Sequence, residues 1–557
     1  MTGLLAAFTA ADIVDAVDTV IAERLCALGG EPDETVALAV ALLVRGLRNG
    51  SVCVDLGRVA EQHELAGTVE VPWPDPEAWL AAVRASPLAG TAPVLRFLDE
   101  LVYLDRYWLE EDQVCRDVSA RLVAVEPAPA QPDLGRLFPE EFAEQRMAAE
   151  AALAQRLTIL TGGPGTGKTT TVARLLAALA EQAARAGDSP PRMALAAPTG
   201  KAAARLQEAV ALEVAKLTAV DRGRLAGLHA ITLHRLLGSR PGTSSRFRHH
   251  RDNRLPHDVI VVDETSMVSL TMMARLLEAV RPDARLLLVG DPDQLASVDA
   301  GAVLADLVDG LGAHGVVELK TSHRFGAAIG ALASAIRAGD DDRLLALLRD
   351  GGEAIEWIDA DDPAELLRPA LVGQAVELRR AAVLGDVAAA QQTLDGHRLL
   401  CAHRRGPFGV AQWNRQVERW LAEETGAPMW SQWYAGRPVL VTANDYGLGI
   451  YNGDTGVVVD SPAGLRAHIG AADFATSRLA DVETMHAMTI HKSQGSQADT
   501  VTVLLPPPES RLLTRELFYT AVTRARRTVR VVGPEASVRA AVRRRAVRAS
   551  GLARRLR

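Results

Sequence analysis

The stretch TGGPGTGKTTT, Thr161–Thr171, follows the apolar run Leu157–Leu160 and opens into a helical pattern, ARLLAALAEQ. Its spacing G-x-x-x-x-G-K-T matches a phosphate-binding loop, which lies between a strand and a helix. The glycines let backbone N–H groups turn around the phosphates, Lys168 reaches the β- and γ-phosphates, and Thr169 holds Mg²⁺. The alternative, a glycine-rich turn that happens to carry a lysine, does not explain both flanks. The stretch therefore predicts a bound nucleotide without saying what its hydrolysis drives.

Two strand patterns further along the chain end in polar residues suited to phosphoryl transfer. In DVIVVDETSM, an apolar run delivers Asp263 and Glu264 to the end of a strand, where an open α/β sheet binds ligands. We expect Asp263 to complete the Mg²⁺ shell with Thr169, and Glu264 to orient or deprotonate the attacking water. The alternative for this acidic pair is a helix cap. Gln294 follows the next strand, in LLLVGDPDQL, where its amide can sense the γ-phosphate.

The composition is that of a soluble globular protein built from several units. The 557 residues, 48% hydrophobic and 23% charged, favour about three or four domains. The cysteines are isolated from one another, which argues against a zinc or iron–sulfur site and for a reducing compartment. Since no basic leader or bilayer-spanning apolar run is found, we expect a cytoplasmic protein without a membrane partner. The net charge of −8 decides nothing about nucleic acids, because a local basic groove suffices.

The patterns divide the chain into a helical part and two α/β parts. Residues 1–125 are mostly helical in pattern, and the proline-rich segment 126–134 is interpreted as a linker. Strand and helix patterns then alternate over 135–330 and again over 331–557, which is typical of parallel sheets covered by helices. The arginine-rich end, VRRRAVRASGLARRLR, is interpreted as a solvated helix and tail.

Two segments of the second α/β part, TIHKSQGS and YTAVTRAR, complete an ordered set of motifs. Arg524 in the latter could supply positive charge to the transferring phosphoryl group from across a cleft. The set resembles the superfamily 1 helicases. In chain order, GGPGTGKTT resembles motif I, APTGKAAARL motif Ia, ITLHRLL motif Ic, VVDETSM motif II, LVGDPDQL motif III, TSHRF motif IV, TIHKSQGS motif V and YTAVTRAR motif VI.

This resemblance implies tandem RecA-like P-loop motor domains that use ATP and Mg²⁺. Gln145, in EQRMAAEAAL, matches the adenine-reading Q motif. Gln497 stands where the family usually has a glutamate that contacts the ribose, and an amide can still hydrogen-bond a hydroxyl. The expected catalytic residues are Lys168, Glu264, Gln294, Arg324 and Arg524. The expected nucleotide contacts are Gln145, Gly162, Gly163, Gly165, Thr166, Gly167, Lys168, Thr169, Thr170 and Gln497, with Thr169 and Asp263 on the metal.

Within that superfamily, Asn444–Val459 (NDYGLGIYNGDTGVVV) resembles the small SH3-like insertion of the RecD group, the 5′-to-3′ branch 1B, and we place the insertion at about 434–480. The stand-alone long RecD type carries helix-hairpin-helix repeats and the conjugative relaxases carry a histidine cluster. We find neither in the first 130 residues, where His63 is the only histidine. The remaining resemblance is to the RecD subunits of RecBCD-type exonuclease V, heterotrimers with RecB-like and RecC-like subunits that process double-strand DNA ends for recombinational repair. The nuclease is expected in a partner subunit.

The family resemblance also implies single-stranded DNA lying across both α/β parts. The candidates for contacts to DNA are Thr199, Lys201, Thr232, His234, Thr489 and His491. A helix cap is the alternative for Thr199 and a core histidine the alternative for His234. The segment 239–257 stands where related enzymes place a hairpin against the strand junction, and a mobile basic loop is its alternative.

Two hypotheses of different class remain open, an active DNA motor, alone or in a complex, and a structural subunit that keeps nucleotide only to hold its shape. The intact catalytic set favours the motor. Aromatic residues are enriched at protein interfaces, so we expect part of the N-terminal set to dock on a RecC-like partner and the rest to fill the core. These aromatic residues are Trp73, Trp79, Tyr103, Tyr107 and Trp108.

Overall fold

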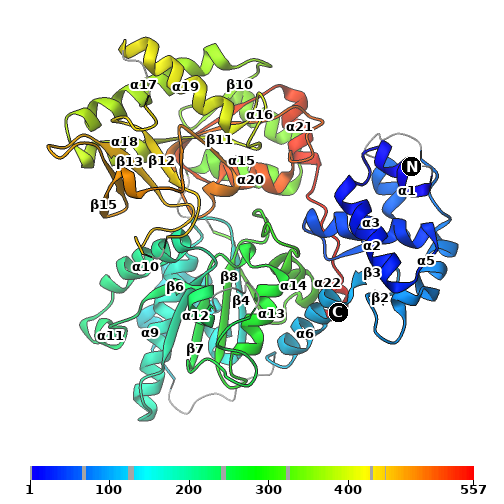
Figure 1. Cartoon of the computed structure of the whole chain (residues 1–557). Helices are drawn as coiled ribbons and strands as arrows, with labels where there is room; N and C mark the ends of the chain where they lie inside the picture. Colours follow the sequence, from blue (N-terminus) through cyan, green and yellow to red (C-terminus); the bar gives the residue numbers. More distant parts are fainter. Residues whose placement is uncertain are drawn as a thin grey trace.

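The computed structural model describes residues 3–64, 71–122, 131–239, 246–321, 326–426, 431–445 and 447–557. Two α/β domains lie one above the other in Figure 1, and a helical N-terminal region lies to one side of them. The predicted α/β class with tandem RecA-like domains is confirmed by two separate parallel sheets. Among the described residues, no helix has the length and apolar character needed to cross a membrane.

The first α/β domain is built on a six-stranded parallel sheet with the order β6-β5-β7-β8-β4-β9. Alternate strand residues enter two different cores, so that Ile159 faces α13 and α14 while Leu160 faces α8 and α9. The strands are β4 (Leu157–Gly162), β5 (Met193–Ala197), β6 (Ala230–Thr232), β7 (Val259–Val262), β8 (Arg285–Gly290) and β9 (Val316–Leu319). The helices are α7 (Leu134–Leu137), α8 (Ala143–Ala154), α9 (Lys168–Ala186), α10 (Gly200–Ala215), α11 (Ala219–Arg224), α12 (Leu233–Leu237), α13 (Leu270–Ala279) and α14 (Val303–Leu311).

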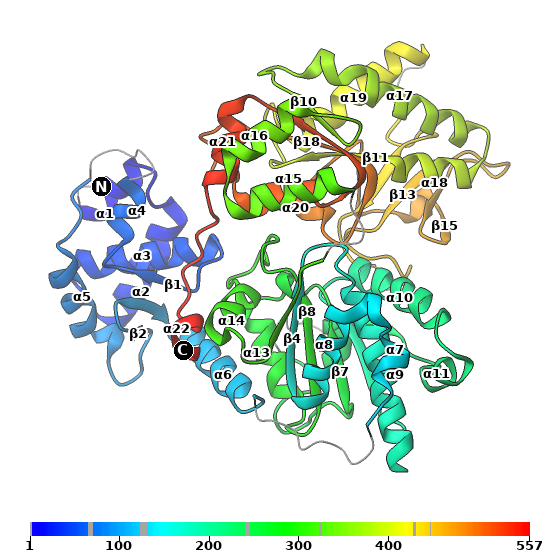
Figure 2. The same ribbon diagram turned by 180° about the vertical axis from the view of Figure 1, so that it is seen from behind.

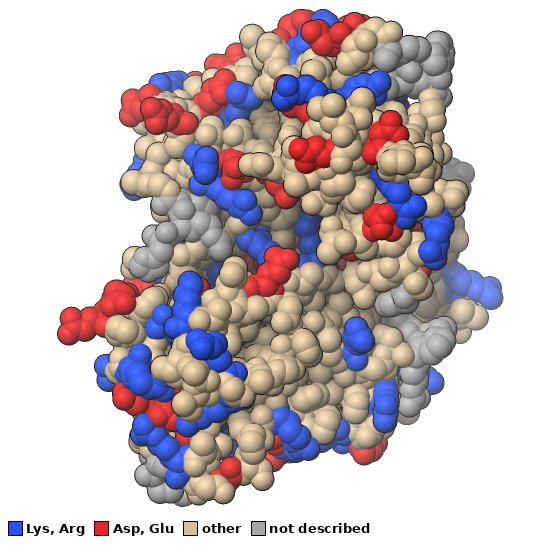
Figure 3. Space-filling view, turned by 90° about the vertical axis from the view of Figure 1, so that its left-hand side faces the viewer, with Lys and Arg blue, Asp and Glu red and all other residues tan. Residues whose placement is uncertain are grey.

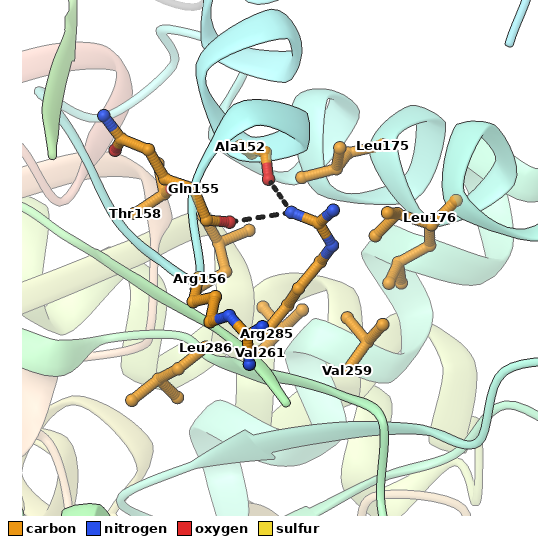
Figure 4. A pocket seen from close by; sticks show the side chains of 12 residues that line it. Ala152, Gln155, Arg156, Thr158, Leu175, Leu176, Val259, Val261, Arg285 and Leu286 are labelled. Carbon is orange, nitrogen blue, oxygen red and sulfur yellow. Dashed lines mark hydrogen bonds between the residues drawn. The ribbon is translucent and has the colours of Figure 1, made fainter. Parts of the chain in front are cut away.

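An arginine fixes α8 at the edge of this sheet where the strands begin. Figure 4 shows Arg285 passing between apolar side chains of α9 and β7 to the last turn of α8. Its guanidinium donates to the carbonyl oxygens of Ala152 at 2.9 Å and Gln155 at 2.7 Å. These are carbonyls that a helix end leaves without intrahelical partners. The cavity beside these carbonyls, of about 10 Å³, has space for a water-sized group only. We therefore assign Arg285 the structural role of anchoring α8.

The second α/β domain has a five-stranded parallel sheet with the order β10-β19-β18-β11-β17. Its strands are β10 (Ile355–Ile358), β11 (His397–Cys401), β17 (Ala487–Thr489), β18 (Ala498–Leu504) and β19 (Ala525–Val532). Its helices are α15 (Ala327–Ala338), α16 (Asp341–Asp350), α17 (Ala364–Val383), α18 (Val387–Gly396), α19 (Val410–Thr425), α20 (Arg515–Val522) and α21 (Glu535–Arg543).

A small antiparallel sheet is inserted between α19 and β17, with the order β15-β14-β13-β12-β16. It occupies the place predicted for the SH3-like insertion. The sheet extends past residue 480, because the last strand pairs with the first, Thr484 opposite Val439. Its strands are β12 (Pro438–Val441), β13 (Thr455–Val459), β14 (Arg466–Ile469), β15 (Ala472–Ala475) and β16 (Val482–Thr484).

The N-terminal region is helical and also contains a three-stranded antiparallel sheet, β1-β3-β2, which the sequence patterns did not predict. The last helix, α6, packs on α13 of the first α/β domain, and Val114 and Val118 enter the core of that domain. Val52 and Tyr103, which precede α6, enter the same core, so the N-terminal region packs closely on the first α/β domain, and the boundary at 125 stays a prediction. The elements are α1 (Leu4–Ala10), α2 (Ala16–Gly29), α3 (Glu34–Arg48), β1 (Cys53–Asp55), α4 (Val59–Glu64), α5 (Pro76–Ala85), β2 (Leu95–Leu98), β3 (Leu101–Leu104) and α6 (Asp105–Ser119).

The N-terminal aromatic residues were expected to be divided between the core and a partner surface. Trp79 and Tyr103 belong to the core, whereas docking by the half-buried Trp73, Tyr107 and Trp108 stays a prediction. Trp79 is buried and donates from its indole to the Thr35 carbonyl at 2.7 Å. Trp73 packs edge-on against Phe8, with ring centroids 4.7 Å apart. Tyr103 is fully buried, and the indole of Trp108 donates to the Phe97 carbonyl at 3.0 Å. Tyr107 is half-buried against the core of the first α/β domain.

The arginine-rich C-terminal end is docked, in contrast to the solvated tail that was predicted. After α21 the chain leaves the second α/β domain and runs to α6, as both views show. The backbone N–H of Val52 donates to the Ala549 carbonyl at 2.9 Å. The final helix, α22 (Leu552–Leu556), packs against α14 and α6, and Leu552 is fully buried. The arginines dominate the sequence pattern of this segment, but its packing depends on Gly551 and Leu552, which are buried, and on Leu556, which packs against the core of the first α/β domain.

A buried carboxylate, Glu111 of α6, holds this end of the chain. It accepts hydrogen bonds from the Ser550 hydroxyl at 2.8 Å, the Gly551 N–H at 3.1 Å and the Tyr103 hydroxyl at 3.0 Å. A Cβ at Gly551 would lie 2.1 Å from the Tyr103 hydroxyl oxygen, so the close approach requires glycine. The C-terminal segment thus joins the N-terminal region and both α/β domains.

We expect Leu552→Ala to lower the free energy of unfolding by about 3 kcal/mol, because a fully buried leucine leaves a cavity when it is truncated. Urea denaturation of the full chain measures the change. The control is Leu512→Ala, whose side chain is 42% exposed and whose loss should cost less than about 0.5 kcal/mol. Equal, small effects of both substitutions would mean that the C-terminal end is solvated.

Candidate ATPase site and nucleic-acid interface

Residues from both α/β domains line one cavity of about 500 Å³. Figure 3 shows a face that is hollowed where the upper and lower domains meet, with Lys and Arg side chains in the hollow. Arg324 lies outside the described residues. Gly162 is the last residue of β4, and Gly163 and Thr166 belong to the loop that follows it. The predicted residues that line the cavity are Gln145, Gly165, Gly167, Lys168, Thr169, Thr170, Asp263, Glu264, Gln294, Gln497 and Arg524.

The loop between β4 and α9 has the conformation that its glycines allow. Gly165 and Gly167 have φ angles of 84° and 87°, in the left-handed region that favours glycine. The Lys168 amine donates to the carbonyl oxygens of Gly162 at 2.6 Å and Gly163 at 2.9 Å. The charged amine is therefore held over the hollow of the loop, at the N-terminus of α9, where phosphate oxygens are expected.

Gln145 connects α8 to this loop. Its side chain is buried, and its amide nitrogen donates to the Thr166 carbonyl at 3.2 Å. A Cβ at Gly167 would lie 2.9 Å from the same nitrogen, so a larger residue there would displace the Gln145 amide. Gln497 reaches the cavity from the second α/β domain. The contacts of Gln145 with adenine and of Gln497 with the ribose stay predictions.

The acidic pair follows β7 directly. Glu264 has a φ angle of 50°, and its N–H donates to the Asp263 carboxylate at 2.9 Å. The Glu264 side chain makes no capping hydrogen bond to the turn Thr265–Met267, so helix capping does not explain it. Burial, and then the charge of Glu264, raise the pKa of Asp263 to about 6. A carboxylate and a hydroxyl, from Asp263 and Thr169, are donors that suit Mg²⁺, and a divalent cation would offset the cost of the buried charge.

A chain of hydrogen bonds links the second α/β domain to the strand end of β8. Arg524, only 4% exposed, donates to the Gln294 amide oxygen at 2.8 Å. The Gln294 amide nitrogen donates to the Asp291 carboxylate at 2.9 Å, and so does the Tyr519 hydroxyl at 3.1 Å. Sequence reasoning missed Asp291 and Tyr519, although both lie within the quoted motifs. An acidic residue directly after an apolar strand, as at Asp263, was the available signal for Asp291.

Several DNA-contact candidates have structural roles that the chain itself explains. The hydroxyls of Thr199 and Thr232 accept from backbone N–H groups, each at 3.2 Å, and cap α10 and α12. The Lys201 amine donates to the Gly453 carbonyl of the SH3-like insertion at 3.2 Å. Burial lowers the pKa of Lys201 to about 8.

The remaining candidates come from motifs Ic and V. His234 packs edge-on against Phe247 at 5.9 Å between ring centroids, and burial lowers its pKa. The Thr489 hydroxyl accepts from the Lys492 N–H at 3.2 Å. Burial also lowers the pKa of His491. These contacts leave the DNA-binding roles as predictions.

The predicted hairpin at 239–257 is partly described. Antiparallel bridges join Ser239 to Phe247 and His250 to Asn253, and Arg251 forms an ion pair with Asp117 of α6 at 2.8 Å. The segment 240–245 lies outside the described residues. A role of the hairpin at a strand junction stays a prediction.

The whole length of the chain matches known sequences. A RecBCD enzyme subunit RecD from Mycolicibacterium smegmatis is 71% identical over 555 residues, covering 100% of this chain and 99% of that one. The chain belongs to the RecD family. A second RecD, from Mycobacterium tuberculosis, is 67% identical over 563 residues, covering 100% and 97%. The ATP-dependent RecD2 DNA helicase of Deinococcus radiodurans is 34% identical over 389 residues, covering 69% of this chain and 48% of that one.

Family models match three parts of this RecD-family chain. The N-terminal domain of RecBCD enzyme subunit RecD matches residues 10–96, an AAA domain matches 142–360, and a UvrD-like helicase C-terminal domain matches 484–532. A solved structure of two Pif1 helicases at forked duplex DNA is 17% identical and covers 70% of this chain and 91% of that one, with a TM-score of 0.39. That TM-score carries no weight for the fold, which the strand order establishes. The predicted resemblance to the RecD helicases is confirmed by the sequence matches.

We expect Arg524→Ala to lower the turnover number for ATP on the order of 10³-fold, with a much smaller loss of nucleotide affinity, as for arginines that stabilise a transferring phosphoryl group. Steady-state kinetics with single-stranded DNA and binding of a fluorescent ATP analogue separate the two effects. The control is Arg527→Ala, an exposed arginine of β19, the strand that begins directly after Arg524. A large rise in the ATP dissociation constant at unchanged turnover would assign Arg524 to ground-state binding instead.

Proposed function

We propose that the chain is a cytoplasmic, ATP-dependent 5′-to-3′ DNA motor that works beside RecB-like and RecC-like subunits at double-strand DNA ends. The observation that carries the proposal is the cavity of about 500 Å³ between the α/β domains, with the phosphate-binding loop on one side and Arg524 on the other. Membership of the RecD family supplies the context of a helicase–nuclease complex.

In this proposal the residues divide the work of phosphoryl transfer. Lys168 and the loop N–H groups hold the phosphates, while Thr169 and Asp263 hold Mg²⁺, which would neutralise developing charge. Glu264 orients or deprotonates the attacking water. Arg524 stabilises the γ-phosphoryl oxygens only when the cleft brings the second α/β domain close. Since ATP is gripped from both sides, binding favours the closed cleft and hydrolysis releases it.

The movement of the cleft reaches DNA through elements at the strand ends of both sheets. Thr199 and Lys201 stand at the start of α10, and Lys201 contacts the SH3-like insertion of the other domain. Thr489 lies at the end of β17. A strand of DNA held by both sets through its phosphates would be drawn along as the cleft opens and closes.

A subunit role is favoured over a stand-alone helicase by the extent of the matches. RecD subunits match the chain over its whole length, whereas the RecD2 helicase match covers 69% of it. A purely structural subunit is disfavoured, because it would need neither a general base beside the phosphate loop nor a buried arginine facing it.

An apolar stripe on α2 is the surface that we assign to a RecC-like partner, because its side chains are more exposed than those of the aromatic set. Val17, Val20, Ile21 and Leu28 are 46%, 63%, 38% and 69% exposed, and their helical spacing puts them on one face. The stripe lies within residues 10–96, which match the N-terminal domain of a RecBCD subunit. The helix belongs to the N-terminal region, which lies to one side of the two α/β domains in both views.

We expect the full chain to hydrolyse ATP only slowly without DNA and much faster with single-stranded DNA, and to unwind duplexes that carry a 5′ tail but not those with a 3′ tail. Lys168→Gln should abolish both activities while the melting temperature barely changes, because Lys168 contacts the loop and supports no core. Hydrolysis and strand-displacement assays measure this. Activity that DNA does not stimulate, or that survives in Lys168→Gln, contradicts the proposed motor.

We expect the double variant Val20→Asp with Leu28→Asp to lose co-purification with co-expressed RecB-like and RecC-like subunits while keeping DNA-stimulated ATP hydrolysis. Charges on the stripe cannot be buried against a partner without a large desolvation cost. The control is Val383→Asp with Leu384→Asp, an exposed apolar pair at the end of α17, 52% and 76% exposed. Complexes that form equally well with both double variants would rule out the stripe as the docking surface.

A further inference from the structure

Side chains of the second α/β domain form hydrogen bonds with the turn after β8, residues 291–295. The Thr520 hydroxyl accepts from the Leu295 N–H at 2.9 Å, and the Gln494 amide donates to the Leu295 carbonyl at 2.9 Å. The Tyr519 hydroxyl donates to the Asp291 carboxylate at 3.1 Å. All these groups are buried. The position of this turn is therefore tied to the second domain by direct hydrogen bonds.

The Gln294 amide inside this turn has only one favourable orientation. Its nitrogen faces the Asp291 carboxylate and its oxygen faces the Arg524 guanidinium. A carboxylate only accepts hydrogen bonds and a guanidinium only donates them. A flipped amide would set oxygen against carboxylate and N–H against guanidinium, at a buried site where unpaired polar groups are costly. Asp291 thus decides which end of the amide faces Arg524.

The orientation of Arg524 depends on that amide. Its Nε donates to the Thr520 carbonyl of α20, the preceding helix, at 3.1 Å, and its Nη2 donates to Gln294 at 2.8 Å. Two hydrogen bonds fix the plane of the guanidinium, so the remaining N–H donors point in fixed directions at the cavity that the residue lines.

Tyr519 joins this chain of contacts to the phosphate-binding loop. A Cβ built on Gly163 would lie 3.1 Å from the Tyr519 hydroxyl oxygen, so the hydroxyl lies close to the loop backbone. The hydroxyl, carried by α20 of the second domain, therefore lies beside the loop and donates to Asp291, the acid after β8. This arrangement can form only when the two domains are close together.

We propose that Tyr519 and Asp291 are positioning residues for ATP hydrolysis. The Tyr519 hydroxyl holds the Asp291 carboxylate, the carboxylate fixes the Gln294 amide, and the amide aims Arg524 at the transferring phosphoryl group. This inference rests on the proposed ATPase function and assigns residues that act through Arg524.

The test is the DNA-stimulated ATPase of the full chain carrying Tyr519→Phe or Asp291→Asn. The expected result is a turnover number lowered about tenfold, the factor that one net hydrogen bond is worth, with less than a twofold change in KM for ATP. Asp291→Asn lowers turnover because its amide N–H can face the Gln294 N–H. The control is Tyr434→Phe, whose buried hydroxyl bonds Glu418 at 3.0 Å and His486 at 3.1 Å inside the second domain.

A double-variant comparison identifies the route of action. Tyr519→Phe should cause no further loss in an Arg524→Ala background, because it acts through that arginine. The inference is overturned if Tyr519→Phe changes only KM, if it loses no more turnover than Tyr434→Phe, or if its loss adds fully to that of Arg524→Ala. A wild-type chain without DNA-stimulated hydrolysis would instead refute the proposed function, so the two failures are distinguishable.

Discussion

The hydrogen bond between Arg524 and Gln294 joins the two α/β domains across the nucleotide cavity, and the arrangement of the site depends on it. Each partner stands at the end of a regular element, Arg524 after α20 and Gln294 after β8. Both elements belong to packed cores, and the bond joins them together with the hydrogen bonds of Thr520, Gln494 and Tyr519 to the turn after β8. The attraction between the guanidinium and the amide oxygen is stronger because water is excluded from the contact. For the same reason, the guanidinium would interact strongly with the charge of a bound phosphate.

The same logic explains why the loop, the acidic pair and Gln294 meet at all. Parallel strands present their carboxyl ends to one edge of a sheet, and β4, β7 and β8 are neighbours there. At the opposite edge, Arg285 fixes the last turn of α8, the helix that carries Gln145 to the loop. The edge where the strands end therefore carries the residues of the nucleotide site, and the edge where they begin holds α8 in place.

The C-terminal segment gives the N-terminal region a fixed relation to both α/β domains. Ala549 pairs with Val52, and Glu111 holds Ser550 and Gly551. A partner bound to the N-terminal region would be mechanically connected to the cleft through α6 and α22. The exposed stripe of α2 is on that region but outside these contacts, which leaves it available for a partner.

The sequence by itself determined the α/β class, the order of the strand-ending motifs and most of the residues at the cavity, because these follow from local spacing and from the geometry of parallel strands. Family resemblance supplied the RecD relationship, and the sequence matches confirm it. Roles at the nucleotide and on DNA stay predictions for each residue, and Thr199 and Thr232 show why, since the same hydroxyl that suits a phosphate also caps a helix.

Only the tertiary structure decided where the ends and the aromatic residues go. The sequence pattern of the charged C-terminal segment predicts a solvated tail, but in the structure its backbone donates a hydrogen bond to the buried carboxylate of Glu111. From the sequence alone, Trp79 and Tyr103 suit a core and an interface equally well, and the structure buries both. Asp291 and Tyr519 are 228 positions apart in the sequence, and no spacing rule relates them. Contacts of that kind come from packing one domain on another, so they are fixed by the whole fold and by no local pattern.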